Sequence, residues 1–285
     1  MSIHIQVAAA RRRLREAGIS QTESDLDARL LAQHVLGWTT ERFLSDGHAQ
    51  APDGFLSQYH TLVERRITRE PLAYIVGARE FWGLELEVTP DVLIPRPATE
   101  LIVEAMLELF PDRSSPLTVA DICTGCGCVA VAIAHERPAS RIVATDISPE
   151  ALEVARRNAA RHGVGDRIAF RHGDLLHGVN GPLDAIVANP PYVVDGARQA
   201  LQPEVRDYEP ALALFGGREG LDLVTRLVAD APKRLRGGGY LVFEFGLGQD
   251  VEIEQLIDSS PDLELIELRR DLEGIARTVV AKRRP

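Results

Sequence analysis

The pattern of hydrophobic and polar positions divides the chain into three stretches. Up to about residue 76, apolar residues recur at helical spacing, which predicts a small bundle of helices. The second helix is expected to begin at a cap formed by Thr22 or Ser24 and to end at Gly37. A third long helix is expected near residues 52–68. The apolar positions of the first two helices are Ile5, Ala8, Ala9, Leu14 (with Arg12 on the same face), and Leu26, Leu30, Leu31, Val35 and Leu36.

Between residues 77 and 97 the period changes. Leu84, Leu86 and Val88 alternate with glutamates, which predicts a short hairpin with one solvated face. The prolines that follow exclude a continuous helix, so this stretch is expected to be a linker with a fixed path. The last of them, Pro97, suits the first turn of a helix that reaches about Phe110.

From residue 117 onward, short apolar runs alternate with amphipathic segments. The apolar runs 263–268 and 275–281 lie too close together for a crossover helix, so they are expected to pair antiparallel at a sheet edge. The pattern predicts an α/β domain over residues 98–285, a doubly wound, mostly parallel seven-stranded sheet with an antiparallel edge hairpin. Residues 1–76 would form a separate helical domain. The other strands are expected at 117–122, 141–145, 168–170, 185–188 and 240–245, and the helices at 129–135, 149–162, 221–235 and 249–257.

Composition and charge narrow the classes of function. The chain is 45% hydrophobic and 26% charged, and no apolar run approaches the roughly 18 residues that cross a bilayer. The first 70 residues contain nine arginines and nine acidic residues, so the net charge of −10 arises in the remainder. That is the wrong overall sign for binding duplex nucleic acid, although a local basic patch stays open. The arginines between residues 11 and 15 faintly resemble a transit peptide, but an ordinary helix with a basic face is favoured.

The three cysteines, Cys123, Cys126 and Cys128, lie within six residues. An odd number at this spacing is a poor disulfide framework and indicates a reducing, cytoplasmic compartment. Cys123 and Cys126 have the spacing of a metal or redox site. Because no second cysteine pair exists, we expect no bound metal.

The segment Asp121–Ala130 follows the first strand of the predicted sheet and opens a helix. Gly125, Gly127 and Ala130 match the dinucleotide fingerprint, in which glycines let the backbone turn sharply and approach a ligand. Asp146 ends the next strand, where a carboxylate can accept both ribose hydroxyls. Because NAD enzymes and methyltransferases share this arrangement, it predicts a nucleoside-containing cofactor without specifying which.

Two acidic positions favour S-adenosylmethionine. Asp121 precedes the glycines, where a carboxylate can meet the amino group of a methionine moiety but would repel a pyrophosphate. Asp174 and Leu175 follow the third strand, where they can bond and cover an adenine. A loop residue that caps a turn is the alternative for Asp174.

The turn Asn189-Pro190-Pro191-Tyr192 follows the fourth strand. The Asn189 amide oxygen and the Pro190 carbonyl can each accept one hydrogen from a planar –NH2 group, on which Tyr192 can stack. Holding a weak nitrogen nucleophile in line with a sulfonium methyl can lower the barrier by about 7–11 kcal/mol. The turn therefore predicts nitrogen methylation; a surface Pro-Pro turn is the alternative.

Together with the Asp121–Gly127 loop, this turn resembles the class I, Rossmann-like amino-methyltransferases. Further segments resemble the HemK/PrmC family of peptide-release-factor glutamine methyltransferases, and the similarity runs essentially from end to end, the helical N-terminal domain included. These segments are Arg79–Trp82, Leu93–Pro97 with Thr99 and Glu100, Val205–Pro210, Gly237–Tyr240 and Arg270–Gly274.

The resemblance implies methylation of the side-chain amide nitrogen of the glutamine in the Gly-Gly-Gln motif of class-1 release factors, with S-adenosylhomocysteine as the product. It implies that catalysis depends on Asn189, Pro190 and Tyr192. It implies that the substrate is bound by Asn189, Pro190, Pro191, Tyr192, Arg96 and Glu100. It implies that the cofactor is held by Asp121, Cys123, Thr124, Gly125, Cys126, Gly127, Asp146, Ile147, Asp174, Leu175 and Asn189. Glu244 either lines the pocket or is a buried acid satisfied by backbone N–H groups. We expect a monomer with no stable nucleic-acid partner.

The sequence departs from the family pattern in two places. The family usually has glycine at the position of Cys123, with small residues at those of Cys126 and Cys128, and often a larger aromatic residue at that of Leu175. Cysteine is small enough to fit, but alkylation of Cys123 and Cys126 is expected to block cofactor binding. The smaller Leu175 leaves its stacking role open.

Other functions compete with this one. An adenine-N6 DNA methyltransferase presents a planar –NH2 group to the same turn, but it needs DNA contacts and a flipped base. A glutamine methyltransferase acting on a ribosomal protein is harder to separate. An NAD-dependent oxidoreductase and a non-enzymatic adaptor complete the alternatives.

Overall fold

The computed structural model describes residues 2–285, which form two compact units. The first unit comprises Met1–Ala78 and Gln202–Tyr208, and the second comprises Arg79–Leu201 and Glu209–Pro285. The sequence predicted the helical domain over residues 1–76 and the α/β domain over residues 98–285. It did not predict that residues 202–208 belong to the helical unit. None of the helices within residues 2–285 combines the length and the apolar character that crossing a bilayer requires.

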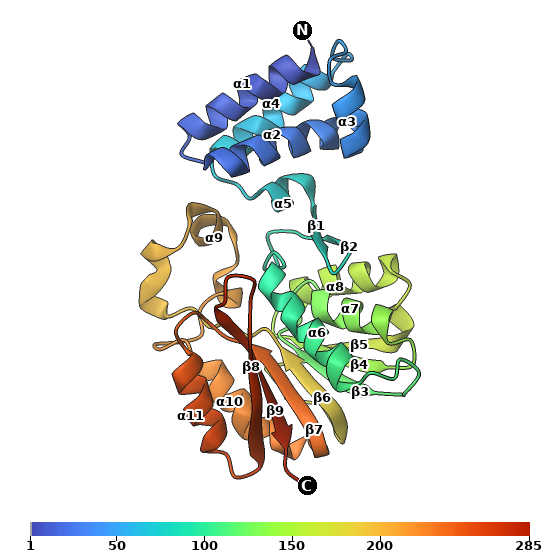
Figure 1. Cartoon of the computed structure of the whole chain (residues 1–285), viewed down its shortest axis with the longest axis vertical. Coiled ribbons are helices and arrows are strands. Elements are labelled where there is room, and N and C mark those ends of the chain that lie inside the picture. Colours follow the sequence, from blue (N-terminus) through green and yellow to red (C-terminus); the bar gives the residue numbers. More distant parts are fainter. Residues whose placement is uncertain (1) are drawn as a thin grey trace. The chain divides into compact units, whose positions relative to one another are not determined.

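The first unit is a bundle of helices (Figure 1). Its apolar core gathers side chains from α1 to α5, among them Val7, Leu31, Phe55 and Tyr59. The Tyr59 hydroxyl donates to the Ala28 carbonyl at 2.9 Å, so the phenol is satisfied inside this core. The helices are α1 (Ile3–Glu16), α2 (Gln21–Leu36), α3 (Thr40–Asp46), α4 (Phe55–Ile67), α5 (Leu72–Val76) and α9 (Pro203–Tyr208).

The structure corrects two details of the predicted bundle. The first helix begins at Ile3 and packs through Ile3, Val7, Ala10 and Leu14, whereas the predicted Ile5 is 55% exposed. The cap of α2 is Ser20, not Thr22 or Ser24. Its hydroxyl accepts from the Glu23 N–H at 3.3 Å and lies 2.7 Å from the Glu23 carboxylate, so the residue three positions on completes the cap. The left-handed Gly37 ends α2 as predicted.

Helix α9 joins the first unit through charges. Arg66 on α4 is almost fully buried and bonds Asp27 at 2.7 Å and Glu204 at 3.0 Å. Arg69 holds the second oxygen of Glu204 at 2.7 Å. No residue of α9 is fully buried, and its contacts with the bundle include these ion pairs and the bond from the Tyr208 hydroxyl to the Thr68 carbonyl.

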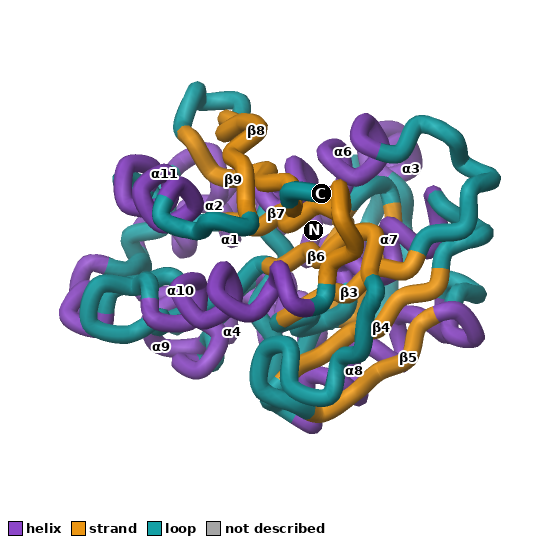
Figure 2. Tube along the Cα trace, turned by 90° about the horizontal axis from the view of Figure 1, so that it is seen from below, coloured by secondary structure: helices purple, strands orange, loops and turns teal. Residues whose placement is uncertain are grey.

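The second unit is a seven-stranded sheet between helices (Figures 1 and 2). The strand order is β5-β4-β3-β6-β7-β9-β8; the first five strands are parallel, and β9 runs antiparallel to both β7 and β8. Helices α6, α7 and α8 cover one face, and α10 and α11 the other. The predicted sheet and its antiparallel edge pair are confirmed. A separate two-stranded sheet, β1 with β2, corresponds to the predicted hairpin.

Most bounds lie within about two residues of the predicted ones, but α10 ends at Asp230 where the helix was predicted to reach 235, and β7 begins at Leu235 where the strand was predicted to begin at 240. The strands are β1 (Ala78–Phe81), β2 (Leu84–Glu87), β3 (Thr118–Ile122), β4 (Arg141–Asp146), β5 (Ile168–His172), β6 (Leu183–Ala188), β7 (Leu235–Glu244), β8 (Leu263–Arg270) and β9 (Ala276–Arg283). The helices are α6 (Glu100–Leu109), α7 (Cys128–Glu136), α8 (Pro149–Arg161), α10 (Asp222–Asp230) and α11 (Asp250–Asp258). A 3-10 turn, Pro97–Thr99, leads into α6, as expected for a proline at a helix start.

The strand register determines which loops meet. Ile122, the last residue of β3, pairs with Thr145 on one side and with Ala188 on the other. The loop after β3, the end of β4 and the turn after β6 therefore lie side by side. On the next strand, Phe243 pairs with Ala188, so Glu244 lies beside the start of that turn.

Candidate active site

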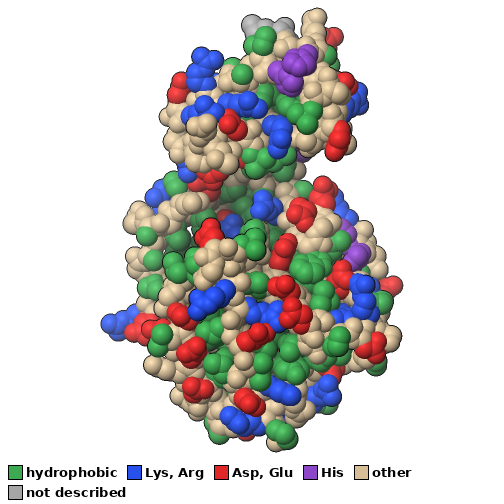
Figure 3. Space-filling model, in the orientation of Figure 1, with side chains coloured by type: hydrophobic (Ala, Val, Ile, Leu, Met, Phe, Trp, Pro, Cys, Tyr) green, Lys and Arg blue, Asp and Glu red, His purple; other side chains and the backbone are tan. Residues whose placement is uncertain are grey.

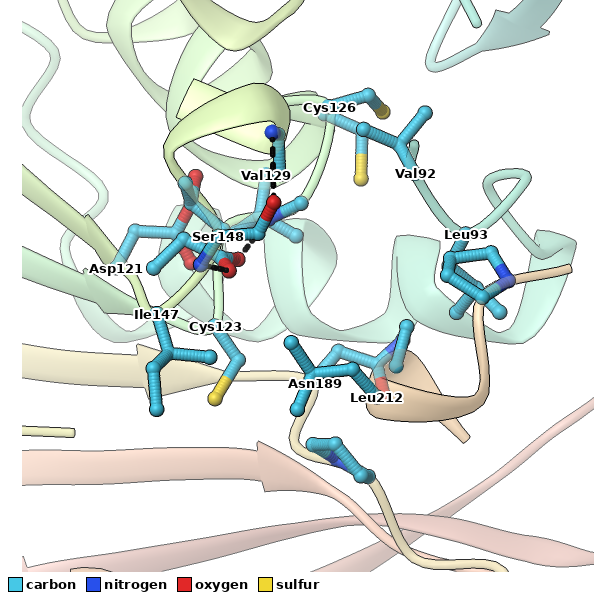
Figure 4. A pocket seen from close by; sticks show the side chains of 18 of the residues that line it. Val92, Leu93, Asp121, Cys123, Cys126, Val129, Ile147, Ser148, Asn189 and Leu212 are labelled. Carbon is cyan, nitrogen blue, oxygen red and sulfur yellow. Dashed lines mark hydrogen bonds between the residues drawn. The ribbon is translucent and has the colours of Figure 1, made fainter. Parts of the chain in front are cut away.

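A cavity of the second unit opens at the carboxyl ends of β3, β4, β5 and β6. The chain order of the strands reverses between β3 and β6, and in open α/β sheets ligands bind at such a point. Figure 4 shows the segments that carry Asp121, Cys123, Ile147 and Asn189 around one space, with Val92, Leu93 and Leu212 also lining it. Its lining includes Thr99, Asp121, Cys123–Cys126, Cys128, Val129, Asp146–Ser148, Asp174, Leu175, Asn189, Pro191 and Leu223.

The loop after β3 turns through left-handed backbone conformations. Gly125 and Gly127 have φ of +55° and +83°, and Cys123 has φ of +58°. A Cβ atom on Gly127 would lie 3.0 Å from the Ala155 Cβ, because the loop packs closely on α8. A Cβ on Gly125 would meet nothing within 4 Å, so the backbone there borders open space, as a ligand-binding loop requires. The left-handed φ of Cys123 accounts for the glycine that the family usually has there.

Asp121 holds this loop in place from within. Its carboxylate accepts from the Thr124 hydroxyl at 2.6 Å and from the Ala130 N–H at 3.1 Å, and the side chain is buried. The pKa of Asp121 is raised to about 7: burial is the main cause, the hydrogen bonds from Thr124 and Ala130 oppose the rise, and the nearby Asp146 adds to it.

Asp146 joins the loop to the end of β4. One carboxylate oxygen accepts from the Gly125 N–H at 2.9 Å, and the other accepts from the Ser148 N–H at 3.0 Å. Burial raises the pKa of Asp146, while these backbone donors oppose the rise. A carboxylate oriented in this way has lone pairs left for the hydroxyls of a ribose.

The loop after β5 provides a third acidic side chain and an apolar wall. Asp174 forms an exposed ion pair with Arg226 at 2.5 Å. Leu175 is buried with φ of +48°, and its carbonyl accepts from the Thr145 hydroxyl at 3.0 Å. Ile147 lines the cavity and keeps 49% of its surface exposed, so an apolar ligand surface could cover it.

The turn after β6 is held by side chains. The Asn189 amide nitrogen donates to the Thr99 hydroxyl at 3.1 Å, and this hydroxyl donates to Glu244 at 2.6 Å. The Tyr192 hydroxyl donates to the other oxygen of Glu244 at 2.9 Å. Burial raises the pKa of Glu244, and its hydrogen bonds with Thr99 and Tyr192 lower it. Of the two alternatives for Glu244, satisfaction by backbone N–H groups is wrong, since side-chain hydroxyls bind both oxygens.

Some predicted site residues lie outside the cavity lining. The Glu100 carboxylate accepts from the Trp82 N–H at 2.9 Å, which stabilises the turn between β1 and β2. Arg96 forms an ion pair with Glu209, whose other oxygen accepts from the Ile94 N–H at 3.2 Å. The role of Arg96 and Glu100 toward a substrate stays a prediction. Pro190, Gly127, Tyr192 and Glu244 do not line this cavity either; Tyr192 borders a second cavity with Gln249 and Arg277.

Sequence reasoning missed several contributors to the site. Thr99 ends the 3-10 turn that begins at Pro97, and no role was predicted for it, although its segment carries the family resemblance. Leu93 and Leu212 supply apolar walls from the linker and from the segment after Pro210. Leu212 is 58% exposed, and an exposed leucine next to a cavity is a signal that appears only once the fold is known.

The residues of this cavity fit S-adenosylmethionine better than a dinucleotide. Four carboxylates, Asp91, Asp121, Asp146 and Asp174, line it, which suits a cofactor with a cationic sulfonium and an ammonium group and disfavours a pyrophosphate. The cysteines are free thiols. Within residues 2–285, no group of three or more His, Cys, Asp or Glu side chains could hold a metal ion.

Comparison with known proteins identifies the family. Residues 7–77 match the model of the PrmC N-terminal domain, and residues 97–205 match that of the methyltransferase small domain. The release factor glutamine methyltransferase of Bradyrhizobium diazoefficiens is 39% identical over 275 residues, which cover 96% of this chain and 92% of the relative. That of Moorella thermoacetica is 38% identical over 289 residues, which cover 100% and 99%.

A solved structure shares the fold of the catalytic unit. The 16S rRNA N2 G1207 methyltransferase of T. thermophilus, in complex with AdoMet and guanosine, aligns with a TM-score of 0.52 at 19% identity. The alignment covers 73% of this chain and 50% of that chain. With relatives of this identity along nearly its whole length, the chain belongs to the family of release factor glutamine methyltransferases, enzymes that use S-adenosylmethionine as the methyl donor.

Proposed function

We propose that this enzyme methylates the side-chain amide nitrogen of the glutamine in the Gly-Gly-Gln motif of class-1 peptide chain release factors. The observation that carries the proposal is the position of Asn189 in the cofactor cavity, with its amide nitrogen bound to Thr99 and its oxygen available to a ligand. The names of the relatives support the same substrate.

The residues of the site divide into two groups by role. The loop Cys123–Gly127, Asp146 and Ile147 would bind the cofactor, with Asp174 and Leu175 on its adenine side. Asn189 and the Pro190 carbonyl would each accept one hydrogen of the glutamine amide, and Tyr192 would pack on its plane. Bound S-adenosylmethionine supplies an activated methyl group to this site.

Positioning is the main contribution of the protein to the reaction. An amide nitrogen is a weak nucleophile, and two acceptors that hold both of its hydrogens orient the nitrogen without needing a strong base beforehand. The carboxylates that line the cavity favour a cationic cofactor. Together these residues would place donor and acceptor atoms of the transfer in one enclosed space.

The proposal extends to location and partners. We expect the enzyme to act as a monomer in the cytoplasm, where its three thiols stay reduced. No stable nucleic-acid complex is expected. On the face shown in Figure 3, acidic and basic side chains are interspersed, and the net charge of the chain is −10.

The test is methyl transfer from labelled S-adenosylmethionine to three acceptors: a purified class-1 release factor, ribosomal protein and duplex DNA. We expect labelling of the release factor alone, and none when its Gly-Gly-Gln glutamine is replaced by alanine. Labelling of ribosomal protein or DNA in preference to the release factor would overturn the proposal.

A further inference from the structure

The Thr99 hydroxyl and the Glu244 carboxylate lie behind the amide-binding turn. Both side chains are 1% exposed, so water does not compete for their hydrogen bonds. Thr99 comes from the start of α6 and Glu244 from the end of β7, and their bond length is 2.6 Å. Thr99 also receives the 3.1 Å bond from Asn189, which connects the turn to the buried carboxylate.

The chemistry of these groups sets the direction of each bond. A carboxylate offers only acceptors, so the Thr99 hydroxyl must give its single proton to Glu244. The Thr99 oxygen can then only accept, and what it accepts must be an N–H of the Asn189 amide. The Asn189 oxygen is thereby turned away from Thr99. The Tyr192 hydroxyl gives its proton to the other oxygen of Glu244, which fixes the tyrosine by the same logic.

We propose that Glu244 and Thr99 are positioning residues that set the substrate selectivity of the turn: they hold Asn189 with its oxygen toward the substrate, so that the turn selects a neutral primary amide and rejects a carboxylate. This inference rests on the proposed function and adds a reason for the choice of glutamine over glutamate.

The selectivity follows from the number of donors each side chain offers. A glutamine amide brings two N–H donors to two acceptors, the Asn189 oxygen and the Pro190 carbonyl. A glutamate carboxylate brings none, and it would meet two acceptors without any proton between them. Sites built to receive a hydrogen bond reject ligands that cannot make it, because buried polar groups are then left unpaired. If Asn189 could rotate by half a turn, its –NH2 group would donate to a glutamate carboxylate instead.

The test compares Thr99→Val with Thr99→Ser. Valine keeps the shape of threonine but removes the hydroxyl, whereas serine keeps the hydroxyl. Three quantities would be measured for each variant: kcat/KM on the release factor, the Kd of S-adenosylmethionine, and the inhibition constants of two release-factor variants in which the motif glutamine is replaced by glutamate or by alanine.

Thr99→Val is expected to lower kcat/KM on the order of 10- to 100-fold, the loss typical of one buried hydrogen-bond partner. The Kd of S-adenosylmethionine should change by less than about 3-fold, since the hydroxyl that is removed bonds Asn189 and Glu244 and valine keeps the methyl group in the cavity lining. The –NH2 group of Asn189 is then free to donate to a carboxylate. The inhibition constant of the release factor with glutamate should therefore fall about 10-fold relative to that of the release factor with alanine. Thr99→Ser should recover the wild-type preference.

A second variant covers the event that Thr99→Val fails to fold. Glu244→Gln keeps the shape of the side chain but brings an –NH2 group to Thr99 or Tyr192, so the direction of the bonds is no longer fixed. The same gain in inhibition by the glutamate variant is expected, and a general loss of structure would weaken both inhibitors equally.

The outcomes separate the two proposals. If the wild-type enzyme methylates the release factor but Thr99→Val retains the wild-type ratio of inhibition constants, the selectivity proposal is wrong and the proposed function stands. Equal effects of the valine and serine variants would also overturn it. No transfer by the wild-type enzyme would overturn the proposed function and the selectivity proposal together.

Discussion

The cavity has a cofactor side, formed by the loops after β3, β4 and β5, and an amide side, formed by the turn after β6 with Thr99 and Glu244 behind it. The two sides are stabilised in different ways. On the cofactor side, the bonds of the loop after β3 join residues that are near in sequence: Thr124 to Asp121, three residues apart, and Gly125 to Asp146, 21 residues apart. Most of the donors to these two carboxylates are backbone N–H groups. On the amide side the bonds join side chains that are 90 and 145 residues apart.

This difference has a consequence for tolerance to substitution. A backbone N–H exists whichever side chain the residue carries, so the cofactor loop can accept an unusual residue such as Cys123. The amide side depends on the functional groups of Asn189, Thr99 and Glu244. Substitutions should therefore have graded effects on the cofactor side and steep effects on the amide side.

Asn189→Ala should have the largest effect. It removes the acceptor for the substrate and the donor to Thr99, so kcat/KM should fall on the order of 10²–10³-fold. The Kd of S-adenosylmethionine, measured by calorimetry, should change far less. Leu272→Ala, at a fully exposed position in the hairpin of β8 and β9, is the control for general effects of substitution. If Asn189→Ala retained a tenth or more of the wild-type kcat/KM, the Asn189 amide would not be the main contact for the substrate amide.

Asp146→Ala tests the cofactor side. It leaves the N–H groups of Gly125 and Ser148 without their acceptor, and the Kd of S-adenosylmethionine should rise about 10- to 100-fold. At saturating cofactor, kcat should change little. Asp146→Asn, which keeps one acceptor oxygen, should give an intermediate Kd. A fall in kcat with unchanged Kd would mean that the two sides are not separable.

Asp121 makes the stability of the cofactor loop depend on pH. In the unfolded chain its carboxyl titrates near 4, whereas burial raises its pKa to about 7 in the folded protein. Between these values the folded protein keeps a proton that the unfolded chain has lost. The contribution of Asp121 to stability therefore falls as pH rises from about 4 to about 7 and is constant above that.

Asp121→Asn removes this dependence while keeping an oxygen for Thr124 and Ala130. Relative to wild type, the free energy of unfolding of the variant should rise by about 1–3 kcal/mol between pH 5 and pH 8. Chemical denaturation at the two pH values, without cofactor, measures the difference. If the free energies of unfolding of the two proteins differed by the same amount at pH 5 and at pH 8, Asp121 would not be the source of the pH dependence.

Cys123→Gly should have the smallest effect. Glycine adopts the left-handed φ of this position without strain but adds flexibility to the unfolded chain, so the stability should change by about 1 kcal/mol or less.

Alkylation of the wild-type thiols should block cofactor binding, and it should be slow, because burial raises the pKa of Cys123. Full activity after complete modification of Cys123 and Cys126 would contradict this.

The order and type of elements in the second unit could be predicted because its strands are short apolar runs and its helices are amphipathic. The cofactor loop could be predicted because its contacts are local in sequence. The same local contacts make it tolerant to substitution. The Asn189 turn was visible as a motif. Its bond to Thr99 and the role of Glu244 were not, because they depend on the register of β6 against β7 and on where α6 begins.

Helix α9 shows the limit of hydrophobic periodicity most clearly. None of its residues is buried, so no apolar pattern marks it. It is fixed by Glu204, whose two partners, Arg66 and Arg69, lie more than 130 residues earlier. Long-range ion pairs of this kind leave no local signature. The misplaced cap of α2 has a simpler origin, since Ser20, Thr22 and Ser24 are all good capping residues and only the geometry distinguishes them.

The return of residues 202–208 to the helical unit bears on how this family can be recombined. Cutting the chain after residue 78 would separate Glu204 from Arg66 and Arg69 and leave α9 without the bundle that it packs on. The helical unit is therefore not an appended module that can be removed or exchanged at a single junction. A functional chimera between two relatives would have to transfer residues 202–208 along with the N-terminal helices, so the two segments should be inherited as a pair.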